Sequence, residues 1–273
     1  MNNLTDALQI PDTQSERDHR QLAIQRVGVK DLRYPLALRV GGAAQTCAAT
    51  WALDVALPAQ KKGTHMSRFI AWLDELHTSG TVLDAAALRE RHGAMLALLD
   101  AEEGRVEAAF SFFLRKRAPV SGLASLLDYR GRWIAETRKG SGAAAAPNTT
   151  LWAEVGVPVK SLCPCSKEIS DYGAHNQRAL VTVRVELLQP VEWHELVRFA
   201  EDEASSEIWP MLKRTDEKWV TERAYENPKF VEDLVRDVAL RLEREPRVGR
   251  YAVEVENIES IHNHSAYARI ERA

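Results

Sequence analysis

Alternating apolar and polar positions predict β-strands in the first half of the chain. The clearest run has apolar side chains at Trp51, Leu53, Val55 and Leu57, with Asp54 and small residues between them. A period of two indicates a strand that buries one face. The same criterion predicts further strands over residues 24–29, 36–40 and 106–115, and a hairpin over residues 126–138 that turns at 129–131.

Two helices are predicted between these strands. After a polar turn, apolar residues recur at the spacing of one helical face, at Phe69, Ile70, Trp72, Leu73 and Leu76. A second helix is predicted over residues 84–100, where the Asp84 carboxylate can accept a hydrogen bond from a free amide of the first turn.

The second half of the chain repeats this order of elements. Strands are predicted over residues 151–160, 181–187, 251–256 and 260–271. One helix is predicted over residues 190–208, and another begins at Asn227-Pro228, where a proline suits the first helical position. Each half therefore predicts two strands, two helices and two strands.

A run of small residues, Ser-Gly-Ala-Ala-Ala-Ala-Pro at 141–147, separates the two halves and is typical of a boundary. We therefore expect two tandem modules, residues 21–145 and 146–273. Residues 1–20 are polar and lack periodicity, so they predict a mobile N-terminal arm that orders against a partner subunit.

The composition is that of an ordinary globular protein and narrows the function classes. Of 273 residues, 45% are hydrophobic and 27% are charged, and a net charge of −3 argues against a general nucleic-acid binder. The apolar runs are too short to span a membrane, and the N-terminus lacks the features of a signal peptide. Three cysteines do not suit a secreted disulfide scaffold. We expect a cytoplasmic protein with neither a membrane nor a nucleic-acid partner.

The densest candidate chemistry surrounds Cys163. Cys163 and Cys165 are two of only three cysteines, with Lys167 and Glu168 directly behind them and His175 twelve residues after Cys163. A thiolate and an imidazole on such an irregular segment can bind a metal or form a nucleophile and base pair. For Cys165 the favoured interpretation is a packed small hydrophobic residue.

Three further polar residues of the second half, Glu217, Glu232 and His262, lie on different predicted elements. A catalytic metal needs about three protein ligands and an open position, and a thiolate, an imidazole and a carboxylate would serve. Spacing alone does not show that these side chains converge, and the paired CxxC pattern of a strong zinc signature is absent. Glu232, in the first turn of its helix, also suits a purely structural role opposite the helix dipole.

A basic turn before the first helix contains Lys61, Lys62, His65, Ser67 and Arg68. Cations, hydroxyls and a flexible glycine next to free helix amides suit a phosphate or another oxyanion. The alternative interpretation is a solvated turn.

Four segments together resemble the type IB GTP cyclohydrolases, the alternative class of the enzyme that opens folate synthesis. They are KGTHMSRF at 62–69, SLCPCSKEIS at 161–170, GAHNQR at 173–178 and ESIHNH at 259–264. The resemblance extends over nearly the whole chain, and the cysteine segment is its most specific part. It implies an α+β tunnelling fold, in which two tandem modules of antiparallel sheet with paired helices assemble into a homotetramer with active sites at subunit interfaces.

The resemblance also implies the reaction and the residues that perform it. GTP and water would give 7,8-dihydroneopterin triphosphate and formate, with one zinc, manganese or iron ion in each active site. Cys163 would be the catalytic cysteine and a metal ligand, His175 and Glu217 would complete the metal shell, and His262 would handle protons. Glu232 would anchor the guanine ring. We further expect the basic residues to contact the substrate, at Lys62, His65, Ser67, Arg68 and Lys167.

The residues alone leave two alternative functions open. A nitrile reductase of queuosine synthesis shares the tunnelling fold and forms a covalent thioimide on a cysteine, but its Glu-Ser-Lys-Ser signature is absent from this sequence. A non-catalytic metal or redox module would use Cys163 and Cys165, and it would bind metal without GTP turnover.

Overall fold

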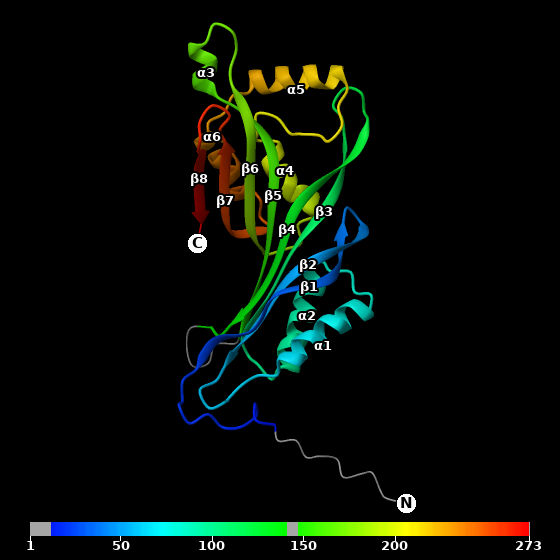
Figure 1. Ribbon diagram of the computed structural model, residues 1–273, viewed down its shortest axis with the longest axis vertical. Coiled ribbons are helices and arrows are strands. Elements are labelled where there is room, and N and C mark those ends of the chain that lie inside the picture. Colours follow the sequence, from blue (N-terminus) through cyan, green and yellow to red (C-terminus); the bar gives the residue numbers. More distant parts are fainter. Residues whose placement is uncertain (1–11, 141–146, 273) are drawn as a thin grey trace, which may run out of the picture.

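The computed structural model describes residues 12–140 and 147–272 as one antiparallel sheet with helices against it (Figure 1). In chain order the elements are β1 (Ile24–Val40), β2 (Ala43–Leu57), α1 (Met66–Thr78), α2 (Ala85–Leu98), β3 (Gly104–Arg117), β4 (Ala124–Arg138), β5 (Asn148–Leu162), α3 (Pro164–Ile169), β6 (Asn176–Leu187), α4 (Trp193–Glu201), α5 (Arg214–Glu226), α6 (Val231–Glu243), β7 (Val248–Ile258) and β8 (Ser265–Arg272). Within these residues, no helix is both long and apolar enough to cross a membrane.

The strands lie side by side in sequence order, β1 to β8, and every neighbouring pair is antiparallel. The pairing of β4 with β5, from Arg130 opposite Gly156 to Arg138 opposite Asn148, joins the two halves of the chain into one sheet. The boundary predicted at 141–147 lies between these two strands, and its first six residues are outside the described part of the chain.

The helices of both halves cover the same face of this sheet. The β2–β3 register puts Trp51 opposite Ala108 and Ala49 opposite Phe110, so Trp51 and Phe110 point to one side. Trp51 packs edge-on against Trp72 of α1 at 6.0 Å, and Phe110 packs against Trp193 of α4 at 5.4 Å. A single hydrophobic core therefore runs beneath α1, α2, α4 and α6.

The hairpin predicted at 129–131 is wrong, because β4 passes through these residues without a turn. Gly131 instead lies opposite Phe110, and a Cβ atom at this position would come within 2.5 Å of the Phe110 ring. The glycine permits close packing rather than a turn. The real β3–β4 turn covers residues 118–123, where Ala118 accepts a hydrogen bond from Gly122, whose φ is +69°.

The first predicted strands, 24–29 and 36–40, are parts of one strand. Pro35 does not interrupt β1, because β1 forms the edge of the sheet, where a missing N–H group is tolerated. A register shift between Val29 and Leu32 accommodates Asp31, whose φ is +57°. Both predicted segments are extended, and the edge position explains why they form one strand rather than two.

Residues 147–272 contain four helices rather than the predicted two. The helix predicted over 190–208 ends at Glu201, and α3 and α5 were not predicted. Among the residues of α5, only Asp216, Val220 and Ala224 are buried, so its apolar stripe is weak.

Asp216 fixes the start of α5 through tertiary contacts. Its carboxylate accepts hydrogen bonds from the Lys213, Val120 and Ser121 amides at 2.8–2.9 Å. Burial alone would raise the pKa of Asp216, but these bonds and the one from the Ser121 hydroxyl hold that pKa well below its usual range. The helix is therefore anchored to the β3–β4 turn of the other half.

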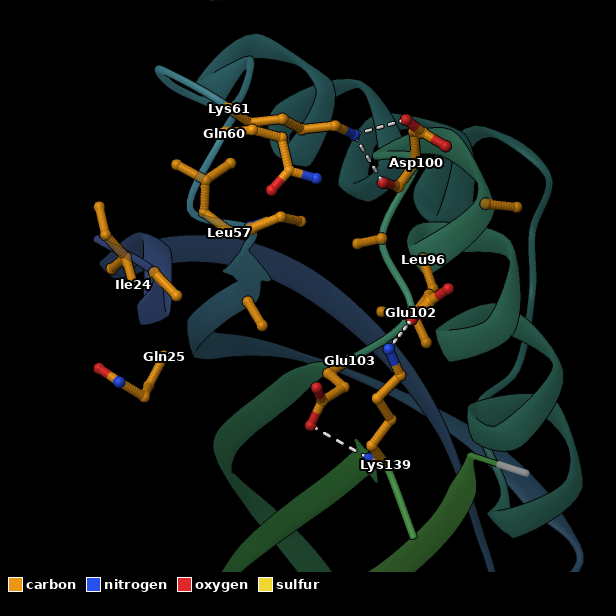
Figure 2. A pocket seen from close by; sticks show the side chains of 15 residues that line it. Ile24, Gln25, Leu57, Gln60, Lys61, Leu96, Asp100, Glu102, Glu103 and Lys139 are labelled. Carbon is orange, nitrogen blue, oxygen red and sulfur yellow. Dashed lines mark hydrogen bonds and ion pairs between the residues drawn. The ribbon is translucent and has the colours of Figure 1, made fainter. Parts of the chain in front are cut away.

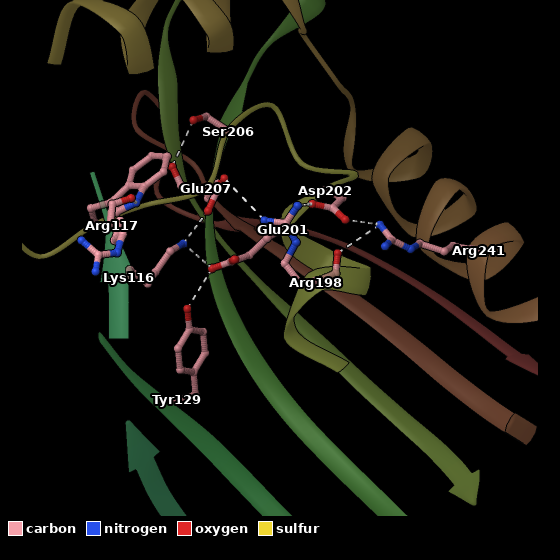
Figure 3. Close-up of polar contacts among 10 residues, drawn as sticks. Lys116, Arg117, Tyr129, Arg198, Glu201, Asp202, Ser206, Glu207 and Arg241 are labelled. Carbon is pink, nitrogen blue, oxygen red and sulfur yellow. Dashed lines mark hydrogen bonds and ion pairs between the residues drawn. The ribbon is translucent and has the colours of Figure 1, made fainter. Parts of the chain in front are cut away.

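A buried polar network also connects the two halves (Figure 3). The Lys116 ammonium of β3 lies 2.6 Å from Glu201 Oε1 and 2.7 Å from Glu207 Oε2, and the Tyr129 hydroxyl donates to Glu201 at 2.8 Å. Burial raises the pKa of Glu201 despite the adjacent ammonium. Each of these buried polar groups has a partner in the network, so none of these charges is left unpaired.

His92 of α2 is a fully buried base in the first half of the chain. Its Nε2 lies 2.9 Å from the Thr137 hydroxyl, which in turn lies 2.7 Å from the Thr149 hydroxyl. Burial, with Arg89 nearby, lowers the pKa of His92 to about 4. In the unfolded chain this histidine takes up a proton near pH 6.5, whereas in the folded chain it does so only near pH 4. The contribution of the neutral ring to the free energy of unfolding is therefore fully present above pH 6.5 and falls as the pH drops toward 4.

We therefore predict that His92→Leu flattens the acid limb of the stability profile. The wild type should lose on the order of 3 kcal/mol of unfolding free energy through this group between about pH 6.5 and 4. Urea unfolding at a series of pH values measures the slope, whatever absolute stability the variant has. The matched control is His77→Gln at an exposed position of α1, which should keep the slope. An unchanged slope in His92→Leu would contradict the assignment.

Candidate active site

Cys163 and His175 lie side by side because they flank two paired strands. Leu162 at the end of β5 is opposite Asn176 at the start of β6. One step further, the Cys163 amide donates to the His175 carbonyl at 3.2 Å. Cys163 is also the N-cap of α3, where its Sγ accepts a hydrogen bond from the Ser166 amide at 3.4 Å. The thiol is thus held at a strand end by the backbone on both sides.

The His175 ring is fixed by side chains from β6 and the segment after β7. Its Nδ1 lies 3.0 Å from Gln177 Oε1 and 3.4 Å from the Ser260 hydroxyl. The buried Gln177 amide donates from Nε2 to Glu259 Oε1 at 3.3 Å. The other oxygen of Glu259 lies 3.9 Å from His262 Nδ1. A chain of polar contacts therefore connects His175 to the half-exposed His262.

The start of α6 brings Glu232 to the same end of the sheet. The Lys229 amide donates to the Leu162 carbonyl at 3.1 Å, and the Ser161 hydroxyl donates to the Lys229 carbonyl at 3.4 Å. Glu232 follows in the first turn of α6, and its side chain is exposed. Cys163, His175, Glu232 and His262 thus share one region.

Glu217 and Lys167 relate differently to this region. The Lys167 ammonium lies 2.5 Å from the Tyr225 carbonyl and 4.3 Å from the Tyr225 ring, so it caps the end of α5. Glu217 is exposed about two turns earlier, roughly 12 Å along the helix axis. Among residues 12–140 and 147–272, no three His, Cys, Asp or Glu side chains are grouped closely enough to hold a metal. The chain does not unite Glu217 with Cys163 and His175.

The other two cysteines lie in contrasting environments. Cys165 is exposed on α3, a helix without buried residues, so its interpretation as a packed hydrophobic residue is wrong. Six residues outside the sheet cannot cover their own side chains. Cys47 of β2 is half-buried, and burial raises the pKa of its thiol to about 11.

The basic turn before α1 is partly neutralised within the chain. Lys62 pairs with Glu16 at 2.5 Å, and His65 Nε2 lies 3.4 Å from Asp12. Arg68 donates to the Leu98 carbonyl at 3.1 Å, and Ser67 is exposed.

The carboxylates come from the predicted arm, whose described residues are bound to the turn. The Gly63 amide donates to the Gln14 carbonyl at 3.1 Å, and the Lys62 amide to the Glu16 carbonyl at 3.1 Å. Residues 1–11 of the arm lie outside the described part. The structure therefore places the segment that holds Gln14 and Glu16 against the basic turn of the same chain.

The basic turn borders two adjoining cavities. His65 and Arg68 line one of about 330 Å³, which shares Lys61 and Asp100 with a neighbour of about 700 Å³. Figure 2 shows the larger cavity, where Lys61 pairs with Asp100 at 2.5 Å and Lys139 with Glu102 at 2.5 Å. Its charges are already paired, and it lies at the opposite end of the sheet from α3 (Figure 1).

Strand length sets the separation between the basic turn and Cys163. The register places Val55 level with Gly104, Gly104 with Thr137, and Thr137 with Thr149. Cys163 follows almost the full length of β5, so on the order of 45 Å of strand separates it from the end of β2. One chain cannot present both regions to the same small molecule.

Gln177 and Glu259 are two buried or nearly buried residues of this region for which the sequence predicted no role. One signal was available, because Gln177 continues the inward-facing alternation of Ala179, Val181 and Val183 along β6. A polar side chain at a core position requires a buried partner. The partner, Glu259, is 82 residues away and could not be identified from spacing.

The arrangement fits a metal in part. Cys163 supplies a thiol, and His175 has Nδ1 engaged by protein groups, which is the arrangement expected of an imidazole that binds a metal through Nε2. Thiolate and imidazole suit zinc and iron, whereas manganese prefers additional oxygen ligands. The third donor expected from the sequence is not adjacent.

The chain is similar to known proteins over nearly its whole length. A family model described as type I GTP cyclohydrolase folE2 matches residues 10–268. GTP cyclohydrolase FolE2 from Methylibium petroleiphilum is 63% identical over 290 residues, covering 96% of each chain. The protein of the same name from Paraburkholderia xenovorans is 57% identical, covering 100% of this chain and 98% of the relative.

Solved structures share the fold at low identity. A hyperthermostable mutant of Bacillus sp. TB-90 urate oxidase has a TM-score of 0.51 at 9% identity, covering 91% of this chain and 98% of its own. Uricase from Arthrobacter globiformis has a TM-score of 0.50 at 11% identity, covering 91% and 93%. These likenesses concern the fold alone, and they confirm the predicted α+β tunnelling fold.

Proposed function

The chain belongs to the type I GTP cyclohydrolase FolE2 family, and from that premise we propose where and how it acts on GTP. It is a GTP cyclohydrolase. This assignment argues against both alternatives, a nitrile reductase and a non-catalytic metal or redox module. The observation that supports the location is that Cys163 and His175 lie side by side at one end of the sheet, where Glu232 stands in the first turn of α6 and His262 follows β7.

We propose that the reaction opens the imidazole ring of GTP at C8. Water adds at C8, formate leaves, and the rearranged product is 7,8-dihydroneopterin triphosphate. This product would enter tetrahydrofolate synthesis in the cytoplasm. Incubation with GTP, followed by assay of formate and of a fluorescent pterin after oxidation, tests the reaction directly.

We propose that Cys163, His175 and Glu217 hold one divalent zinc, manganese or iron ion. Such an ion would supply water that is nucleophilic near neutral pH. Cys163 and His175 are already adjacent, whereas the exposed Glu217 lies apart on α5. The proposal therefore requires that metal binding or assembly bring this carboxylate to the pair.

His262 is the proposed proton donor to the opening ring. An imidazole titrates in the physiological range, so it can exchange protons at neutral pH. Its ring is half-exposed and lies 3.9 Å from the Glu259 carboxylate. This position leaves the ring accessible to a substrate.

Cys163→Ala is predicted to abolish GTP turnover and to lower bound metal, because the change removes both a ligand and the cysteine assigned to catalysis. Formate release and elemental analysis of the purified protein measure the two effects. Cys165→Ala is the matched control, since this exposed thiol lies two residues away and should leave both quantities near wild type. Activity in Cys163→Ala together with its loss in Cys165→Ala would reverse the assignment.

Glu232→Ala is predicted to weaken GTP binding while metal content stays unchanged. A carboxylate offers two acceptors to N1–H and the exocyclic amine of guanine, and unpaired buried donors cost about 1–3 kcal/mol, or roughly 5- to 150-fold in affinity. Equilibrium binding of GTP measures the loss. Asp233→Ala, in the same helical turn, is the control for helix damage. Loss of metal with unaltered GTP affinity would assign Glu232 to the metal shell instead.

We propose that the triphosphate is held by residues of the basic turn of a different subunit, namely Lys62, His65, Ser67 and Arg68. Lys167, within the cysteine segment, would also contact the substrate. About 45 Å of strand between the two regions of one chain supports an interface site, as in a homotetramer. The arm carboxylates Glu16 and Asp12 contact Lys62 and His65, so a bound triphosphate would compete with them.

Arg68→Ala is predicted to raise KM for GTP much more than it changes metal content. Its guanidinium would contact charges far from C8, which position the purine without taking part in the chemistry. Steady-state kinetics with GTP and with guanosine separate the roles, because guanosine lacks the phosphates. The variant should also lose part of the ionic-strength dependence of the wild type. Equal impairment with both substrates would make the turn structural.

A further inference from the structure

The Gln177 side chain lies between His175 and Glu259, and its amide offers them opposite hydrogen-bonding groups: an acceptor to His175 and a donor to Glu259. It is 8% exposed at the start of β6, with Oε1 3.0 Å from His175 Nδ1 and Nε2 3.3 Å from Glu259 Oε1. Glu259 follows β7, and its side chain is 12% exposed. Both contacts are therefore shielded from water, where a mismatched hydrogen bond is costly.

The carboxylate determines which way the amide faces. An ionised Glu259 can only accept hydrogen bonds, so the NH₂ group of Gln177 must point toward it. The reversed amide would place a carbonyl oxygen against a carboxylate oxygen. The Gln177 carbonyl oxygen consequently faces His175, as the distances indicate.

The amide in turn determines the state of the imidazole. A carbonyl oxygen can only accept, so Nδ1 of His175 must carry the proton, and in the neutral ring Nε2 then carries the lone pair. The Ser260 hydroxyl, 3.4 Å from Nδ1, can rotate to accept the same proton.

Resting on the proposed function for what binds at the free nitrogen, we propose that Gln177, oriented by Glu259, is a positioning residue that fixes the His175 tautomer. The neutral ring keeps its proton on Nδ1 and presents Nε2 as the donor atom toward a metal. Gln177 does for His175 what a carboxylate or backbone carbonyl does for other metal-binding histidines.

A tautomer measurement on the metal-free protein tests this assignment without reference to catalysis. Nitrogen NMR of protein labelled at histidine, above the ordinary histidine pKa, distinguishes a protonated Nδ1 from a protonated Nε2, and His175→Ala identifies the signals. The wild type should show the proton on Nδ1. Gln177→Leu should shift the population toward Nε2–H, and Glu259→Gln should shift it partly, because a second amide can accept as well as donate.

The matched control is Asn257→Leu. Asn257 is another buried amide at the end of β7, 4% exposed, and it bonds to the Ser161 hydroxyl rather than to His175. This variant should perturb packing while the tautomer stays as in the wild type. A proton on Nε2 in the wild type, or an unchanged tautomer in Gln177→Leu, would overturn the inference.

Zinc titration supplies the second readout and separates this inference from the proposed function. Gln177→Leu should bind Zn²⁺ about 10- to 100-fold more weakly than the wild type, as for lost partners of other metal-binding histidines. Asn257→Leu should bind it like the wild type. If His175→Ala binds Zn²⁺ as tightly as the wild type while the tautomer results hold, the proposed metal site fails and the role of Gln177 stands. If Gln177→Leu does not fold, the wild type and Glu259→Gln spectra still decide.

Discussion

The antiparallel ladder between β4 and β5 is the constraint on which the rest of the molecule depends. It runs from Arg130 opposite Gly156 to Arg138 opposite Asn148 and makes one sheet of two halves. Because the sheet is continuous, the helices of both halves share one face and one core. The same continuity separates the end of β2 from the end of β5 by nearly a whole strand length, so the two polar regions of the chain are far apart.

The candidate site lies where the ends of β5, β6 and β7 meet the starts of α3 and α6. Backbone hydrogen bonds place Cys163 beside His175 and Lys229 beside Leu162, so the short segments that carry the proposed site residues extend from rigid elements. Within this frame, the buried Gln177 amide connects the imidazole to Glu259. Positions set by the sheet and orientation set by buried hydrogen bonds are the two requirements of a preorganised site.

At the opposite end of the sheet from the candidate site, basic side chains are paired with carboxylates. Lys62 and His65 are paired with carboxylates of the arm, and Lys61 is paired with Asp100. Such exposed pairs contribute little to stability, so replacing one of these carboxylates by another anion costs little. A multiply charged phosphate chain is an anion of this kind, which connects the local pairing to the proposed role of the turn.

The sequence by itself determined the elements with a strong period, such as the alternation through Trp51 and the stripe through Phe69. Local patterns suffice there because each element buries one face. The sequence also singled out Cys163 and His175, which the structure places side by side. Only the tertiary structure decided that Gly131 lies inside a strand, since its reason is the Phe110 ring opposite. Likewise, the partner of Gln177 lies 82 residues away, and a contact that depends on the register of intervening strands leaves no local trace in the sequence.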